Sequence, residues 1–227
     1  MSSVRESLAE IRERIGSAAR RAGRDPGTVT LVAVCKKQPV GRILEAYAAG
    51  QRVFGENYVQ ELKEMRSALE KSAEGSSWHF IGHLQSNKAR LASSLADVIE
   101  TVDSAELAAR LDKAAREASR RLGVLIEVRL GAEGSKSGVL EADLARLVDR
   151  VSALESLSLS GLMSIPPAEG SRRWFAELRR IRDATERATG RALPELSMGM
   201  SADFEDAIEE GATIVRVGTL LFGARSG

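Results

Sequence analysis

Short apolar runs alternate with amphipathic helical patterns along nearly the whole chain, and this alternation limits the possible folds more than any other feature. The runs are rich in β-branched residues, which predicts buried strands at residues 30–35, 52–54, 78–82, 97–102, 124–130, 157–165, 194–198 and 213–217. Apolar residues at helical spacing predict helices at residues 4–22, 39–50, 59–65, 87–95, 104–122, 141–154, 171–189 and 201–210. Parallel strands joined by helices are buried on both faces, and eight such units suit a closed barrel.

We therefore predict an α/β fold, a single (β/α)8 TIM barrel domain over residues 1–227 with an extra N-terminal helix. An open, doubly wound sheet is the main alternative. No Gly-x-Gly-x-x-Gly motif follows the first predicted strand, which disfavours the dinucleotide-binding form of that sheet.

The charge balance narrows the choice of partners. The chain has 33 lysines and arginines against 32 acidic residues, so no excess charge points to nucleic acid or to an anionic membrane. Cys35 is the single cysteine, which excludes an internal disulfide and fits a reducing compartment. The N-terminus is polar, and no apolar run approaches the roughly 18 residues of a membrane span. We expect a cytoplasmic protein, with a monomer as the simplest state.

Lys36 directly follows the first predicted strand. Side chains alternate faces along a strand, so Lys36 shares a face with Val32 and Val34. If that face lines the barrel, Lys36 stands at the C-terminal mouth, where the active sites of such barrels lie. Burial favours the neutral amine, which is the nucleophile that forms Schiff bases. A solvated lysine at a strand end, followed by Lys37, is the simpler alternative.

Glycine and hydroxyl residues follow the last two predicted strands. Gly199 and Ser201 come after the seventh strand, and Gly218 and Thr219 come after the eighth. These two loops form the phosphate site in many such barrels, because backbone amides at a helix start favour an anion. Alternatively, Ser201 is a helix cap and Gly218 a packing glycine; Ser201 can serve both purposes.

Arg216 interrupts the apolar run of the eighth strand. A buried guanidinium must find partners, and Arg216 has the strand parity of Gly218, so we expect it to face the lumen. An ion pair with a barrel glutamate, Glu100 or Glu127, is the structural alternative.

A lysine, a phosphate pocket and an inward arginine together suggest pyridoxal 5′-phosphate (PLP). Lys36 would carry the cofactor covalently as an aldimine, and Arg216 would donate to the pyridine nitrogen. Since arginine stays protonated, that nitrogen would remain unprotonated and the ring would be a poorer electron sink. This combination favours a cofactor carrier over a transaminase.

Several motifs resemble those of the YggS/PROSC-type PLP homeostasis proteins, in order and almost end to end. They are Leu31-Val-Ala-Val-Cys-Lys36, Phe54-Gly-Glu-Asn-Tyr58, Trp78-His-Phe-Ile-Gly82, Leu84-Gln-Ser-Asn-Lys88, Ser135-Lys-Ser-Gly138, Gly161-Leu-Met163, Leu196-Ser-Met-Gly-Met-Ser201, Val215-Arg-Val-Gly-Thr219 and Phe222-Gly-Ala-Arg225. Cys35 and Lys37 depart slightly from the family pattern. The parity of Cys35 is opposite to that of Lys36, so we expect it to pack against a helix as a small apolar residue.

The resemblance implies a fold like the alanine racemase N-terminal barrel, with PLP bound through Lys36. It also implies a role in vitamin B6 homeostasis, storing or delivering the cofactor to PLP-dependent apo-enzymes, without efficient catalysis. The motif positions around the cofactor are Lys36, Asn57, Ser201, Arg216, Gly218 and Thr219. We assign no catalytic residue and no metal ligand.

Two other functions compete with this interpretation. An amino-acid racemase needs a second acid–base group opposite the lysine. Neither of the two tyrosines, Tyr47 and Tyr58, is evidently placed for that role. In alanine racemase a separate C-terminal domain supplies the second group, and we do not expect such a domain here. A Schiff-base aldolase acting on a phosphosugar would use the same lysine without a coloured cofactor. His79 is either a lumen-facing acid or base or a hydrogen-bonded core histidine.

Overall fold

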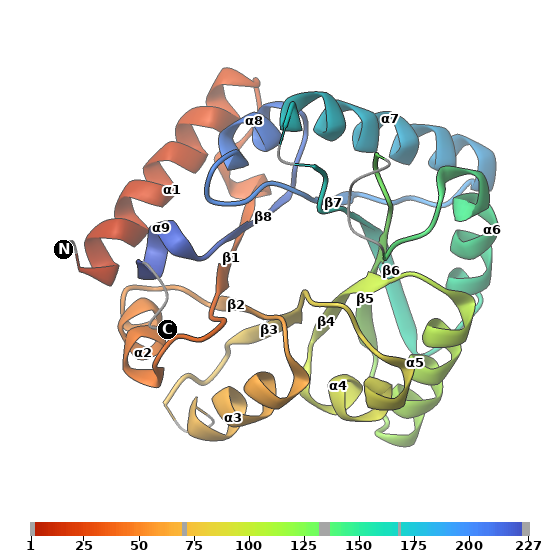
Figure 1. Cartoon of the computed structure of the whole chain (residues 1–227), viewed down its shortest axis with the longest axis horizontal. Coiled ribbons are helices and arrows are strands. Elements are labelled where there is room, and N and C mark those ends of the chain that lie inside the picture. The colour runs from red at the N-terminus through yellow and green to blue at the C-terminus, as the bar shows by residue number, and fades with distance from the viewer. Residues whose placement is uncertain (1–2, 70–71, 132–136, 168, 224–227) are drawn as a thin grey trace.

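The computed structural model describes residues 3–69, 72–131, 137–167 and 169–223, and its strands form a closed parallel barrel in chain order. Looking down the molecule, the strands surround a central axis and the helices form an outer ring (Figure 1). The strands are β1 (Thr30–Val34), β2 (Val53–Glu56), β3 (Ser77–Phe80), β4 (Val98–Val102), β5 (Leu122–Glu127), β6 (Leu157–Met163), β7 (Glu195–Ser197) and β8 (Ile214–Val217). The predicted (β/α)8 barrel is confirmed.

The helices α1 to α8 follow the predicted amphipathic patterns, and α9 is a further short helix. They are α1 (Val4–Arg21), α2 (Val40–Ala48), α3 (Val59–Leu69), α4 (Ala89–Leu95), α5 (Ala105–Glu117), α6 (Glu141–Ser152), α7 (Ser171–Thr189), α8 (Phe204–Glu209) and α9 (Thr219–Phe222), with short 3-10 turns η1 (Pro26–Thr28) and η2 (Ser86–Lys88). Among the described residues, none of these helices combines the length and apolarity needed to cross a bilayer.

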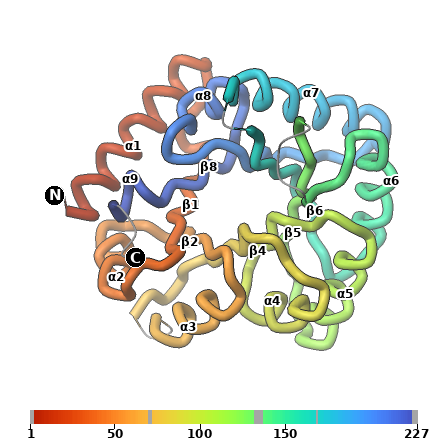
Figure 2. The backbone as a smooth tube through the Cα atoms, in the orientation of Figure 1, coloured from red at the N-terminus to blue at the C-terminus, as the bar shows by residue number. Residues whose placement is uncertain are grey.

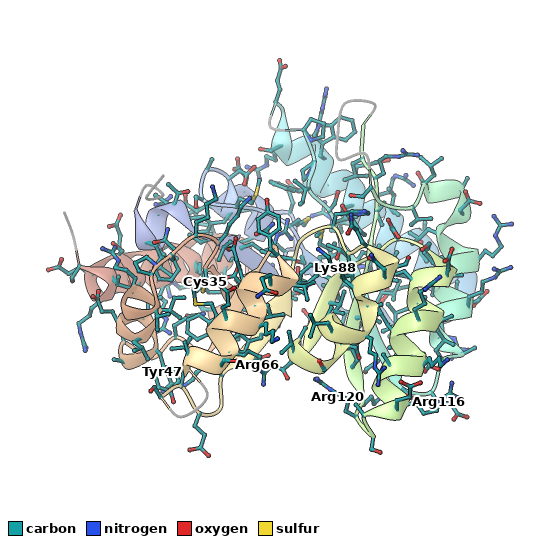
Figure 3. All side chains as sticks on the ribbon, turned by 60° about the horizontal axis from the view of Figure 1, so that its bottom comes forward. Cys35, Tyr47, Arg66, Lys88, Arg116 and Arg120 are labelled. Atoms are coloured by element: carbon teal, nitrogen blue, oxygen red, sulfur yellow. The ribbon has the colours of Figure 1, made fainter. Side chains whose placement is uncertain are left out.

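The alternation of side chains along the strands separates two apolar layers. Val32, Leu125, Met163 and Ile214, each from a different strand, form a small apolar cluster that is separate from the larger core. Residues of opposite parity on the same strands join the larger core under the helices. Cys35 belongs to this outer core and is fully buried, as its strand parity predicted. Figure 3 labels it on the side of the barrel that α2 and α3 cover.

The extra N-terminal helix, α1, lies against the end of the chain. Ser3 caps it in a reciprocal capping box with Glu6, which satisfies two backbone amides. In Figure 2, α1 lies beside α8 and α9, where Arg14 forms a 2.8 Å ion pair with Glu205. The first and last strands meet at the same place, since β1 pairs with β8 and closes the barrel.

Several element bounds differ from the sequence prediction; α5 ends at Glu117 and not at residue 122, and β6 ends at Met163 and not at residue 165. The fifth strand ends at Glu127, three residues before the predicted end, because Val128 makes only an isolated bridge with Val139. The helix α9 was not predicted, since a four-residue turn is too short to show a helical period. Ser201 was predicted to cap α8, and this is wrong: α8 begins at Phe204, after a turn closed by a hydrogen bond from Asp203 N to Met200 O.

Candidate cofactor site

A cavity of about 310 Å3 opens at the C-terminal ends of the strands, where functional sites of such barrels lie. All six candidate residues predicted from the sequence line it. Its walls are completed by apolar residues from several strands and loops, and the lining consists of Val34, Lys36, Gln38, Asn57, Ile81, Ile165, Met200, Ser201, Ala202, Arg216, Gly218, Thr219 and Gly223.

Lys36 projects into this cavity from a tight turn. Gln38 N donates to Cys35 O at 2.9 Å, and Lys37 has a φ of 56°, an unusual left-handed conformation for a residue other than glycine. Glu61 on α3 accepts a hydrogen bond from Lys37 N at 3.1 Å and so ties the turn to the helix. Lys36 itself is half-buried.

Tyr58 is a site residue that sequence reasoning did not assign. The Lys36 Nζ lies 4.9 Å from the centre of the Tyr58 ring, within the range of a cation–π contact. The side chain is 50% exposed and stands beside the lysine at the rim of the barrel. Its position directly after Asn57 in a strand-end loop was the available signal.

The loops after β7 and β8 meet each other, as predicted. Leu220 N donates a long, 3.5 Å hydrogen bond to Ser201 Oγ. A side chain at Gly218 would place its Cβ 3.2 Å from Val34, so glycine allows the last loop to lie close to β1. The first N–H groups of a helix lack intrahelical acceptors, and Thr219 is the first residue of α9.

Asn57 is held in place by its neighbour strand. A Cβ at Gly82 would lie 2.0 Å from Asn57 O, so only glycine permits the end of β3 to pass this loop. A second, neighbouring cavity shares Asn57 with the first and is lined in part by His83, Leu84, Gln85 and Lys88 of the motif that follows. Lys88 lies just before α4 (Figure 3). Ser135 and Lys136 lie outside the described residues, as does Arg225.

Arg216 is buried in the lumen and lines the floor of the cavity. It donates to Ser197 Oγ at 2.6 Å and to Ser164 O at 2.9 Å, and its Nη1 lies 3.8 Å from Glu100. Arg216 therefore does both: it forms the ion pair with Glu100 that the sequence offered as an alternative, and it also lines the cavity. Burial lowers the pKa of Arg216, and the nearby carboxylates Glu100 and Glu127 oppose this effect.

His79 is a hydrogen-bonded core residue, the second of its two predicted roles. Its Nδ1 lies 2.6 Å from Glu100 Oε1. Burial opposes ionisation of Glu100, but the His79 hydrogen bond and the Arg216 charge outweigh it, so the pKa of Glu100 is lowered. The barrel thus holds an ionised carboxylate beneath the cavity.

Known proteins place this fold and site in one family. The alanine racemase N-terminal domain model matches residues 7–226. The chain is 43% identical to the pyridoxal phosphate homeostasis protein of Escherichia coli (strain K12), over 99% of this chain and 98% of that protein. The chain therefore belongs to the alanine racemase N-terminal domain family and, within it, to the pyridoxal phosphate homeostasis proteins.

Solved structures agree with this assignment. PipY of Synechococcus elongatus PCC7942, with PLP bound, superposes with a TM-score of 0.87 at 39% identity, covering 97% of this chain and 100% of that chain. Alanine racemase of Clostridium difficile 630 superposes with a TM-score of 0.76 at 14% identity, over 99% of this chain and 57% of that one. The second likeness concerns the fold alone.

Proposed function

We propose that this protein binds PLP covalently through Lys36 and stores or delivers it within the cell, without efficient catalysis. The observation that carries the proposal is the convergence of Lys36, Arg216 and the loops after β7 and β8 on one cavity. PipY, the solved relative at 39% identity, is described with PLP bound.

The residues present fit the cofactor. A cavity of about 310 Å3 is in the size range of small-molecule sites, roughly 300–1,000 Å3. Apolar side chains of Val34, Ile81 and Ile165 supply walls for an aromatic ring. The close approach of Gly218 to Val34 narrows the end of the cavity where the phosphate loops lie.

Lys36 is the attachment residue of this proposal. The neutral form of Nζ would be the nucleophile toward the aldehyde of bound PLP, with water as the leaving group. The turn tied to Glu61 directs Nζ into the cavity, and the Tyr58 ring stabilises its protonated form when no cofactor is attached. Asn57 completes the wall beside the lysine.

The loops after β7 and β8 hold the phosphate. Ser201 contributes its hydroxyl, and Gly218 and Thr219 contribute backbone amides at the start of α9. Hydrogen bonds to an ionised group are each worth about 1.5–3 kcal/mol, so this end of the site provides most of the selectivity for the phosphorylated form.

Arg216 faces the pyridine nitrogen from the floor of the cavity. Because a guanidinium only donates hydrogen bonds, it keeps that nitrogen unprotonated. Bound PLP supplies an electron-withdrawing ring, which withdraws less strongly in this state. This supports a carrier in preference to a catalyst.

An amino-acid racemase is the second candidate, and the position of Tyr58 favours it. The tyrosine ring lies 4.9 Å from Lys36 Nζ, so the pair could in principle serve as two bases. Against this, Tyr58 contacts the lysine through its ring face and is 50% exposed to solvent.

Reduction of the purified protein with borohydride tests the attachment. We expect a visible absorbance band that borohydride removes, and a pyridoxyl group on Lys36 by peptide mapping. Lys36→Ala should lose the band, whereas Lys37→Ala, whose side chain is exposed, is the matched control and should keep it. A label only on Lys37 or Lys88 would refute the assignment.

A transfer assay separates delivery from storage. The protein loaded with PLP is mixed with a PLP-dependent apo-enzyme, and recovery of that enzyme's activity is compared with the rate of spontaneous release. Faster recovery supports delivery. Recovery no faster than release supports storage.

A further inference from the structure

A continuous chain of buried polar side chains crosses the barrel directly below the cavity. It runs from Arg216 on β8 to Ser197 on β7, then to Glu100 on β4 and His79 on β3. The distances are 2.6 Å from Arg216 Nη1 to Ser197 Oγ, 2.5 Å from Ser197 Oγ to Glu100 Oε2, and 2.6 Å from Glu100 Oε1 to His79 Nδ1. We call these four residues the lumen chain.

The lumen chain is shielded from solvent. Ser197 and Glu100 are fully buried, Arg216 is 3% exposed and His79 is 6% exposed. Charges in such surroundings are costly unless they are paired and hydrogen-bonded. The chain meets this condition because Glu100 balances the charge of Arg216 through a bridging hydroxyl.

The direction of each hydrogen bond follows from the chemistry of the groups. Arg216 can only donate, so the Ser197 oxygen accepts from it and the Ser197 hydroxyl proton points to Glu100. Ionised Glu100 can only accept, so His79 carries a proton on Nδ1. A single arrangement of protons therefore satisfies all four residues.

The same arrangement restrains the guanidinium. Two of the five N–H groups of Arg216 are committed to Ser197 Oγ on β7 and to Ser164 O, directly after β6. The planar fork is fixed by these two bonds while Arg216 still lines the cavity.

We propose that Ser197 and Glu100 are positioning residues, which set the orientation and charge of Arg216 toward the ring nitrogen of the cofactor. The contact with the ring nitrogen rests on the proposed function, whereas the restraint of Arg216 does not. Removing either residue should free the guanidinium to rotate and should expose the ring nitrogen to protonation.

The restraint is tested first in the cofactor-free protein. Hydrogen exchange of the Arg216 guanidinium is followed by NMR, with the signals assigned by their loss in Arg216→Lys. Loss of a hydrogen bond worth about 1.4 kcal/mol changes an equilibrium constant tenfold. We therefore expect the guanidinium protons to exchange roughly tenfold faster in Ser197→Ala and Glu100→Gln.

Two further variants serve as controls. Thr185→Val removes a buried hydroxyl that donates to Ile181 O within α7 and takes no part in the lumen chain, so it should leave the Arg216 signals unchanged. Ser197→Thr keeps the bridging hydroxyl and should restore slow exchange. If Ser197→Ala folds and its Arg216 guanidinium exchanges as slowly as in the wild-type protein, the proposal is overturned. Ser197→Ala alone decides the question if Glu100→Gln does not fold.

The effect on the cofactor is measured with PLP labelled with nitrogen-15 in the ring. In the wild-type protein, the ring-nitrogen shift should stay that of an unprotonated pyridine across the neutral range, about pH 6 to pH 9. In Ser197→Ala and Glu100→Gln it should titrate within that range. A shift that stays constant in both variants would overturn the link to the cofactor.

The two proposals fail separately. If wild-type protein binds no PLP, the proposed function is wrong, and the guanidinium exchange still decides whether Ser197 and Glu100 restrain Arg216. If PLP binds and the variants behave like Thr185→Val in both measurements, the positioning role is wrong and the proposed function stands.

Discussion

Glu56 and Glu100 are two buried glutamates whose surroundings give them opposite properties. Glu100 receives hydrogen bonds from His79 and Ser197, which favour its ionised form. Neither carboxylate oxygen of Glu56 has a hydrogen-bond partner among the described residues, although the side chain is fully buried. Burial and the charge of nearby Glu61 raise the pKa of Glu56 to about 8. At neutral pH, Glu56 is therefore mostly protonated behind the turn that carries Lys36.

The raised pKa of Glu56 predicts that stability falls as pH rises. Between its ordinary pKa of 4.5 and about 8, the folded protein keeps a proton that the unfolded chain releases, so the free energy of unfolding decreases with pH. The slope from this group is at most about 1.4 kcal/mol per pH unit. Urea unfolding at several pH values should show a weaker decline in Glu56→Gln. The exposed Glu10 provides the control Glu10→Gln, and equal slopes in all three proteins would refute the prediction.

Ser201 is the side chain whose removal best tests the phosphate end of the site. Loss of its hydroxyl removes one hydrogen bond to an anion, about 1.5–3 kcal/mol, so Ser201→Ala should weaken PLP retention about tenfold or more. Affinity for dephosphorylated pyridoxal should be nearly unchanged. Binding of both forms is measured by equilibrium dialysis, and an equal loss for the two would show that Ser201 does not contact the phosphate.

At the scale of elements, the end of β3 determines where the loop after β2 can lie. Gly82 passes so close to Asn57 O that any Cβ must displace the backbone. Gly82→Ala should therefore destabilise the protein by about 1–3 kcal/mol, the usual cost of overpacking, and should reduce PLP retention through Asn57 and Tyr58.

A second glycine supplies the control for this prediction. Gly41 lies in α2 with no atom within 4 Å of its would-be Cβ, so Gly41→Ala should leave stability equal or slightly higher. Thermal unfolding of both variants makes the comparison. Equal stability of Gly82→Ala and Gly41→Ala would contradict the close approach at β3.

The sequence predicted those elements whose apolar period is long enough to recognise. The strand parity of Lys36 and Arg216 follows directly from alternation, and both residues line the cavity. The spacing of apolar residues could not predict where α8 begins, because individual backbone and side-chain hydrogen bonds form the turn at Met200–Asp203 that precedes it. The sequence offered the Arg216–Glu100 ion pair and a hydrogen-bonded His79 as alternatives. It did not predict the bridging role of Ser197 or the contact of Tyr58 with Lys36, because both depend on contacts between residues that are separated in the sequence.

At the scale of the whole molecule, we expect the protein to bind PLP without efficiently converting amino acids. We expect solvent-deuterium exchange at the α-carbon of amino acids to be far slower than the typical enzymatic range of about 1–1,000 per second. The physical reason is the proposed contact of Arg216 with the ring nitrogen, which would limit electron withdrawal. The assay follows exchange and racemisation together across a panel of amino acids. Turnover in the enzymatic range, abolished in Tyr58→Phe, would establish the racemase instead.

The pairing of β1 with β8 has a consequence for synthesis of the protein. Lys36 is translated well before Arg216 and the loops after β7 and β8, although all of them line the same cavity. Domains fold as units during translation, at about 5–20 residues per second, so the barrel cannot close around a nascent chain that lacks β8. If the proposed site holds the cofactor, a product stalled before β8 should therefore not retain PLP, and only chains that have closed the barrel should bind it.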